Sequence, residues 1–370
     1  MMNIAITGAN GFIAKNLIFN FKLLNDCNLF TITRSTPKKR IDFILRNSDI
    51  IYHLAGVNRP KINKTFKKDN YQFTKYICNF IKREKLNKKI IFTSSIQIKN
   101  KNKYGSSKKE CEKLLFELSK NNNSKIVILR LPNIFGKWSK PNYNSVISTF
   151  CHNIARDKKI NISSLRNTIE LLYIDDLVEE FLKIKDKNLA KLKIVSKFKN
   201  VKKINLKNLS ELIYNFHNNR KNLYSINFKN KFEKNLYSTY ISFLPKKNFS
   251  YNLKLKKDNR GSFMEFLKTK NSGQFSIFVA KKNKIRGHHF HHSKVEKFLV
   301  LKGSAKFKMQ NISNNKLFEL DLKGSLPKVV ETIPGWQHYI KNVGSKDLIV
   351  LLWSNEVFDV NKPDTFKLNL

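Results

Sequence analysis

The sequence predicts a doubly wound, parallel α/β domain followed by a smaller all-β domain. In the first half of the chain, short apolar runs alternate with segments of helical apolar spacing, which indicates parallel strands joined by crossover helices. Gly8 and Gly11 directly follow the first of these runs. From about residue 248, short alternating runs are separated by turn signals, which is typical of a β-sandwich or barrel.

The elements of the first half follow from the spacing of apolar residues. Five short runs rich in β-branched residues are expected to be strands: 3–7, 29–33, 49–54, 89–93 and 125–130. Apolar residues recur at helical spacing in three segments between them: 13–24, 71–85 and 104–119. Residues 206–234 are helical at first and then rich in Asn and Lys. We therefore expect two domains, residues 1–245 and 246–370, each long enough to bury a core.

In the last third, dense turn signals indicate a β-domain. Short strands lie between five segments that carry Gly, Asn, Asp or Lys at turn positions: 258–261, 302–303, 310–314, 323–324 and 342–344. Because helical spacing is rare here, the predicted architecture is a sandwich or barrel.

The charge of the chain is large but spread over its whole length. With 72 Lys and Arg against 27 Asp and Glu, the formal net charge is +45. A hydrophobic fraction of 41% excludes a disordered polycation. The basic residues are not gathered into an arm or a nucleic-acid-binding module. The abundance of Lys, Asn, Ile and Phe is what an AT-rich coding sequence would give, so no nucleic-acid partner is expected. The charge would still attract an anionic small substrate.

The same composition predicts a cytoplasmic protein. No window of about 18 apolar residues is present, so no membrane insertion is expected, and the N-terminal residues do not resemble a signal peptide. The four cysteines are scattered, without a CxxC pair, which disfavours a disulfide framework: Cys27, Cys78, Cys111 and Cys151.

The segment after the first strand has the features of a dinucleotide cradle. Gly8 permits a tight turn, Gly11 lets the backbone approach a pyrophosphate at the helix N-terminus, and Ala14 allows close packing of helix on strand. The strand before and the helix after supply the required context. We expect the cofactor to contact Gly8, Asn10, Gly11, Phe12 and Ile13.

Two further strand ends bear on the cofactor. The second strand ends at Arg34 rather than at Asp or Glu, and an Arg there accommodates a 2′-phosphate, so NADPH is favoured over NADH. The third strand is followed by small residues where a cofactor would pass: Leu54, Ala55 and Gly56.

A tyrosine and a lysine four residues apart predict acid–base chemistry. On a helix, Tyr104 and Lys108 share one face. A nearby ammonium is expected to lower the pKa of the phenol, which makes Tyr104 a usable proton donor. A serine at the end of the neighbouring strand, Ser95 or its competitor Ser94, could hold the substrate carbonyl beside it.

The histidine run 288–292 predicts a metal site. On a strand, His289 and His291 face one side, whereas His288, Phe290 and His292 face the other. Glu296 and His338 could converge on the first pair. Three imidazoles and a carboxylate form a mixed N/O set suited to zinc or another divalent ion.

The first 240 residues resemble the extended short-chain dehydrogenase/reductase family of nucleotide-sugar enzymes. The resemblance is carried by Gly8–Ala14, His53–Gly56, Ser95, Tyr104 with Lys108, Arg130–Asn133 and Tyr173–Asp176. It implies a Rossmann domain in which Tyr104 is the general acid, Lys108 binds the nicotinamide ribose and lowers the pKa of the tyrosine, and Ser95 polarises the ketone.

Residues 246–370 resemble the cupin family, a jelly-roll barrel, through HxH, a nearby Glu and a distant His. This resemblance implies the metal ligands His289, His291, Glu296 and His338. The order reductase then cupin, with the segments Lys137–Ser145 and Leu236–Tyr240, resembles the CapF-type family of bifunctional UDP-sugar enzymes. That resemblance implies a homodimer, a UDP-2-acetamido-2,6-dideoxy-hexos-4-ulose substrate and substrate contacts at Asn133, Lys137 and Asn142.

The two domains make chemical sense together. A 4-keto group acidifies the proton on C3, so the second domain can invert C3 before the first reduces the C4 ketone with NADPH. The resemblance to the CapF-type family implies that this chemistry leads towards UDP-N-acetyl-L-fucosamine for capsule or O-antigen. One alternative is a reductase whose β-domain is only structural or dimerising. Another is a basic sugar- or nucleic-acid-binding protein with a non-catalytic Rossmann domain.

Overall fold

The computed structural model describes residues 1–58, 66–100, 102–162, 166–188 and 190–367. It divides into two compact units, one of residues 1–214 with 228–245 and one of residues 215–227 with 246–370. Each unit is described by itself. Within the described part of the chain, no helix is both long enough and apolar enough to span a membrane.

The first unit is built on a six-stranded parallel sheet in the order β2-β1-β3-β4-β5-β8. Its strands are β1 (Met2–Thr7), β2 (Cys27–Ile32), β3 (Ile50–His53), β4 (Lys89–Ser95), β5 (Lys125–Leu131) and β8 (Leu192–Val195). The chain order reverses between β1 and β3, which is the topological switch point where open α/β sheets bind ligands. The predicted doubly wound fold is confirmed.

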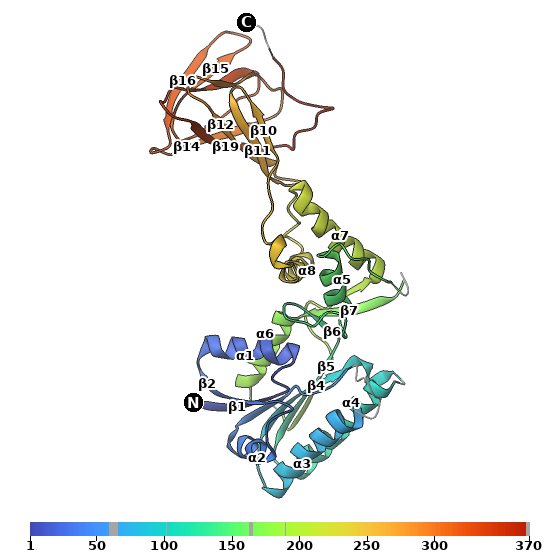
Figure 1. The fold of residues 1–370 in the computed structure, drawn as a ribbon. Helices are drawn as coiled ribbons and strands as arrows, with labels where there is room; N and C mark the ends of the chain where they lie inside the picture. The colour runs from blue at the N-terminus through green and yellow to red at the C-terminus, as the bar shows by residue number, and fades with distance from the viewer. Residues whose placement is uncertain (59–65, 101, 163–165, 189, 368–370) are drawn as a thin grey trace. The chain divides into compact units, whose positions relative to one another are not determined.

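Helices cover both faces of this sheet, and each face has its own core (Figure 1). The helices α1 (Phe12–Leu24) and α6 (Ile174–Asp186) pack on one face, whereas α2 (Lys38–Asn47), α3 (Phe73–Arg83) and α4 (Lys103–Asn121) pack on the other. Strand residues alternate between the two cores: Ile4 and Ile6 belong to the first and Ala5 to the second. Both faces are therefore buried, which explains the almost continuous apolar runs of these strands.

The rest of the first unit is a small sheet with helices. The strands β6 (Asn133–Phe135), β7 (Thr168–Tyr173) and β9 (Lys202–Asn205) form the sheet. The helices are α5 (Val146–Ile154), α8 (Lys231–Ser242) and the first part of α7 (Leu206–Asn222).

The second unit consists of antiparallel strands in two sheets around one core, as predicted for an all-β domain. One sheet contains, in spatial order, β10 (Leu255–Asp258), β11 (Gly261–Lys268), β12 (Gln274–Ala280), β19 (Leu348–Ser354), β14 (Glu296–Lys302) and β17 (Val329–Glu331). The other contains β13 (Ile285–His289), β18 (Trp336–Asn342), β15 (Ser304–Asn311) and β16 (Leu317–Lys323). Side chains such as Phe298, Phe307 and Ile340 fill the space between the sheets.

Two expectations differ from the structure. The helix expected over 71–85 begins earlier, as a π-helix over Lys67–Gln72, before α3. Residues 215–227, expected in the first domain, belong to the second unit because they bond to it: Lys268 N donates to Leu223 O, and Arg220 donates to Asn248 O.

Candidate active site and metal centre

The turn between β1 and α1 has the geometry of a phosphate cradle. Gly8 has a φ of +68°, and a Cβ at this position would lie 2.8 Å from the Ala55 Cα atom. Gly11 is the N-cap of α1, and its N–H donates to Gly8 O at 2.7 Å. The positive end of α1 therefore lies at the carboxyl end of β1, beside the switch point of the sheet.

A buried polar chain fixes this turn from below. Thr7 Oγ1 lies 2.8 Å from His53 Nδ1 and accepts a hydrogen bond from Ala55 N at 3.1 Å. His53 Nε2 lies 2.9 Å from Thr74 Oγ1 on α3. Burial, with Lys108 nearby, lowers the pKa of His53 to about 3, so the ring is neutral at physiological pH. The sequence analysis assigns His53 no role of its own, because the polar partners of its ring come from distant segments.

Arg34 lies just beyond β2, where a ribose 2′-substituent is read in this fold. Its side chain is 81% exposed and pairs with Asp69 at 2.9 Å. The guanidinium is therefore accessible to a phosphate.

Tyr104 and Ser95 are brought together by a short connection. Ser95 ends β4 and caps the following 3₁₀ turn, where its Oγ accepts from Gln97 N at 3.2 Å. Tyr104 lies in the first turn of α4. That turn packs so closely that a Cβ at Gly105 would be 2.1 Å from Gln97 O. Burial raises the pKa of Tyr104 to about 12, and a side-chain hydrogen bond with Ser95 opposes that rise.

The competing serine has different surroundings. Ser94 Oγ is buried and, among the described residues, has no hydrogen-bond partner. The side chain of Ser95, unlike that of Ser94, opposes the rise in the pKa of Tyr104, which supports Ser95 as the serine beside Tyr104.

Lys108 does not act on Tyr104 as expected. Its Nζ donates to Thr93 O at 2.8 Å and lies 4.7 Å from the centre of the Phe92 ring. Burial lowers the pKa of Lys108 to about 8. The expected lowering of the tyrosine pKa is wrong for this structure, because burial of the phenol dominates. A Cβ at Gly56 would lie 3.0 Å from Lys108 Nζ, so a larger residue there would press on the ammonium.

The three residues expected at the substrate have separate partners. Asn133 Nδ2 donates to Glu170 O at 3.2 Å, and Lys137 Nζ donates to Asp175 Oδ1 at 2.6 Å. Asn142 N donates to Thr149 Oγ1 at 3.0 Å. A cleft in the same unit is lined by other residues, among them Phe135 and Asp176.

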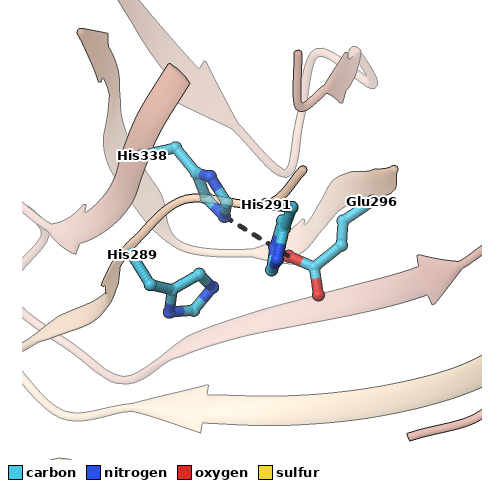
Figure 2. Close-up of side chains that lie close together, drawn as sticks. All are labelled: His289, His291, Glu296 and His338. Carbon is cyan, nitrogen blue, oxygen red and sulfur yellow. Dashed lines mark ion pairs between the residues drawn. The ribbon is translucent and has the colours of Figure 1, made fainter. Parts of the chain in front are cut away.

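In the second unit, the structure brings together the side chains of His289, His291, Glu296 and His338 (Figure 2). One potential ligand atom from each lies within 4.8 Å of all the others. His289 ends β13 and pairs across the sheet with His338 on β18, while Glu296 is the first residue of β14. Three strands therefore supply three of the four groups, and His291 comes from the segment just after β13.

The electrostatics of this cluster fit a cation. His291 Nε2 and His338 Nε2 lie 3.5 and 3.3 Å from Glu296 Oε2, yet both nitrogens are buried without a hydrogen bond among the described residues. Burial alone would raise the pKa of Glu296, but the three imidazoles hold it well below its usual range. Burial lowers the pKa of His338, although Glu296 opposes this. Three imidazoles and a carboxylate that converge on one point, with His291 Nε2 and both ring nitrogens of His338 unbonded among the described residues, form the donor set of a divalent metal.

The histidine run is not a regular strand. A β-bulge separates Gly287 from His289, and His288 has a φ of +67° and stacks on Tyr339 at 4.8 Å. Phe290 and His292 pack instead against Phe366. His289 and His291 thus reach the cluster through a bulge and a strand end rather than through plain alternation.

Comparison with known proteins covers both units. The NAD dependent epimerase/dehydratase family model matches residues 4–195, and the polysaccharide biosynthesis C-terminal domain model matches residues 256–366. A Pseudomonas aeruginosa PA103 protein named UDP-2-acetamido-2,6-beta-L-arabino-hexul-4-ose reductase is 43% identical over 368 residues, which cover 99% of this chain and 98% of the relative.

Comparison with solved structures also finds similarity over both units. The capsular polysaccharide assembling protein CapF from Staphylococcus aureus matches with a TM-score of 0.92 and 39% identity over 100% of both chains. UDP-glucuronic acid 4-epimerase from Bacillus cereus, in complex with NAD, matches with a TM-score of 0.53 and 18% identity over 59% of this chain and 84% of that one, which shows a shared fold alone.

Proposed function

The chain belongs to the NAD dependent epimerase/dehydratase family and, along its whole length, to the CapF-type family; on this premise we propose that it is an NADPH-dependent reductase of a UDP-linked 4-keto sugar. The substrate is UDP-2-acetamido-2,6-dideoxy-hexos-4-ulose, and the second unit inverts its C3 before the first unit reduces C4. The observation that carries the proposal is the presence of two separate chemical sites, one in each compact unit.

In the first unit, the residues of the chain bind the cofactor and donate one proton to the substrate. The cradle at Gly8 and Gly11 binds the pyrophosphate, and Arg34 binds the 2′-phosphate. The nicotinamide supplies the hydride. Tyr104, protonated because its pKa is about 12, donates its proton to the oxygen on C4, while Ser95 orients that oxygen. Lys108 binds the nicotinamide ribose through its ammonium.

In the second unit, His289, His291, Glu296 and His338 hold a divalent ion, which we propose is zinc. Such an ion would supply Lewis acidity towards the ketone oxygen and so acidify the C3 proton. Reduction of C4 then removes the acidifying ketone and fixes the new configuration at C3. His288 and His292, which flank the expected metal ligands in the sequence, are the candidates for the base that moves the C3 proton.

Further parts of the proposal concern the setting of the enzyme. We propose a homodimer in the cytoplasm, where the four free cysteines are stable as thiols, with a product that enters capsule or O-antigen. Substrate contacts at Asn133, Lys137 and Asn142 belong to the same proposal.

The test separates the two sites with His291→Ala and, for comparison, His292→Ala. His291→Ala should lose bound metal and, with it, solvent deuterium exchange at C3 of the 4-keto sugar. This exchange reports the epimerisation step alone, because it needs no cofactor. NADPH binding should remain, since the cradle lies in the other unit. His292→Ala should keep its metal, because this side chain packs on Phe366 outside the cluster.

Two outcomes would contradict the assignment. Normal C3 exchange in a metal-free His291→Ala protein would show that the metal is structural and the second unit does not use it for epimerisation. No NADPH oxidation by the unaltered protein with the 4-keto sugar would overturn the reductase itself.

Loss of exchange with retained metal in His292→Ala would identify His292 as the base.

A further inference from the structure

His291 is held from outside the metal cluster by a segment 73 residues further along the chain. Its Nδ1 faces the main-chain carbonyl oxygen of Asp364 within hydrogen-bond distance. A carbonyl can only accept, so Nδ1 must carry the proton. The proton-free nitrogen is then Nε2, the one that faces Glu296 Oε2 at 3.5 Å.

The side chain of Asp364 grips the turn that links His291 to Glu296. One carboxylate oxygen accepts from His292 N at 2.9 Å. The other accepts from Ser293 N at 2.7 Å, from Lys294 N at 2.8 Å and from Ser293 Oγ at 2.9 Å. Four donors on three consecutive residues thus bind one carboxylate, and hydrogen bonds to a charged acceptor are stronger than neutral ones.

A second contact fixes the register of this segment. Phe290 and Phe366 exchange both main-chain hydrogen bonds, at 2.9 and 3.0 Å, and their rings lie 5.5 Å apart. The pairing places Asp364 opposite the turn after His291. The carbonyl that orients the imidazole and the carboxylate that holds the turn therefore belong to the same residue.

We propose that Asp364 is a positioning residue of the metal centre, which fixes the Nδ1–H tautomer and the ring orientation of His291. The inference rests on the proposed metal site, because it gives Asp364 a role through a ligand of that site. Partners of this kind in the outer shell orient metal-binding histidines, and their loss lowers metal affinity by about 10- to 100-fold.

The experiment compares Asp364→Ala and Asp364→Asn with Asp359→Ala in the full chain. Asp359 is a matched control because it lies in the same segment, is exposed and, within the described part of the chain, is bonded to near neighbours: its carboxylate accepts from Asn361 N and its carbonyl from Lys362 N. Zn²⁺ affinity is measured by competition with a chelator. The tautomer of His291 is read from ¹⁵N chemical shifts of the imidazole nitrogens in metal-free protein.

Asp364→Ala keeps the main-chain carbonyl but loses the carboxylate that holds this carbonyl opposite His291. We therefore expect Asp364→Ala to bind Zn²⁺ about 10- to 100-fold more weakly than Asp359→Ala, and its metal-free His291 to populate both tautomers. Asp364→Asn keeps one acceptor oxygen, so its Zn²⁺ affinity should lie between those of Asp364→Ala and Asp359→Ala. NADPH affinity should be equal in all three proteins. A purely structural effect would lower the unfolding temperature without changing the tautomer.

Unchanged Zn²⁺ affinity together with an unchanged Nδ1–H tautomer in Asp364→Ala would overturn the inference. If Asp364→Ala does not fold, the same two measurements on Asp364→Asn decide. If the unaltered protein binds no Zn²⁺, the proposed metal centre fails, yet the tautomer in metal-free protein still shows whether Asp364 controls His291.

Discussion

Replacement of Arg34 by alanine tests the choice of cofactor with little effect on folding. The Arg34 side chain is 81% exposed and its ion pair with Asp69, at 2.9 Å, lies at the surface. Exposed pairs of this kind contribute about 0–1 kcal/mol, so Arg34→Ala should fold normally. A hydrogen bond between a guanidinium and a phosphate is worth about 1.5–3 kcal/mol. At 1.4 kcal/mol per decade, NADPH should bind about 10- to 100-fold more weakly.

NADH is the internal reference for this variant. It has no 2′-phosphate, so its affinity should change by less than about twofold, within the effect of one exposed charge. Asp69→Asn is the matched control, because it removes the partner of Arg34 and leaves the guanidinium free. That variant should bind NADPH at least as tightly as the unaltered protein, with the difference reduced at high salt.

The assay is a fluorescence titration of each protein with NADPH and with NADH at two salt concentrations. Equal losses for the two cofactors in Arg34→Ala would show that Arg34 supports the local fold rather than reading the 2′-phosphate. Weaker NADPH binding by Asp69→Asn would show that the ion pair itself shapes the site. Either result would refute the reasoning from exposure and charge.

Two other predictions concern the reductase chemistry. Tyr104→Phe keeps the buried ring but loses the acid, so single-turnover hydride transfer should fall by about 100-fold or more while NADPH still binds; near-normal turnover would exclude Tyr104 as the proton donor. Because the pKa of Lys108 is lowered to about 8 and that of Tyr104 raised to about 12, kcat/KM should decline above about pH 8 as Lys108 loses its charge while Tyr104 stays protonated. A profile flat to pH 10 would contradict the role of the ammonium.

The turn between β1 and α1 could be predicted because its signal is local. Gly8 and Gly11 lie between a strand and a helix, and the left-handed φ of Gly8 follows from that short segment, whereas the close approach of Ala55 depends on the packing of β3 beside β1. The same holds for the placement of Tyr104 and Lys108 one turn apart on α4. The strands were predictable because both faces of the sheet are buried, which leaves continuous apolar runs.

The electrostatics of the active site could not be predicted in the same way. The i, i+4 spacing correctly places Lys108 one turn after Tyr104, but spacing says nothing of how deeply either group is buried. Lys108 donates to Thr93 O from the neighbouring strand, a partner that only the packed fold supplies. Desolvation then moves both pKa values away from the charged forms, which is the opposite of the effect expected for the tyrosine.

In the candidate metal centre, the expected residues come together through a geometry that their spacing in the sequence does not give. Alternation along a strand selected His289 and His291. In the structure, β13 ends at His289, and just before it lies a bulge in which His288 has a left-handed backbone conformation. Beyond β13, Gly335 N donates to the main-chain oxygen of His291, and the carbonyl of Asp364 accepts from its ring. Asp364 lies 73 residues from His291, so its contact with the imidazole leaves no periodic signal in the sequence. Ligands can be predicted from residue type and spacing, whereas the groups that orient them are fixed only when distant segments pack together.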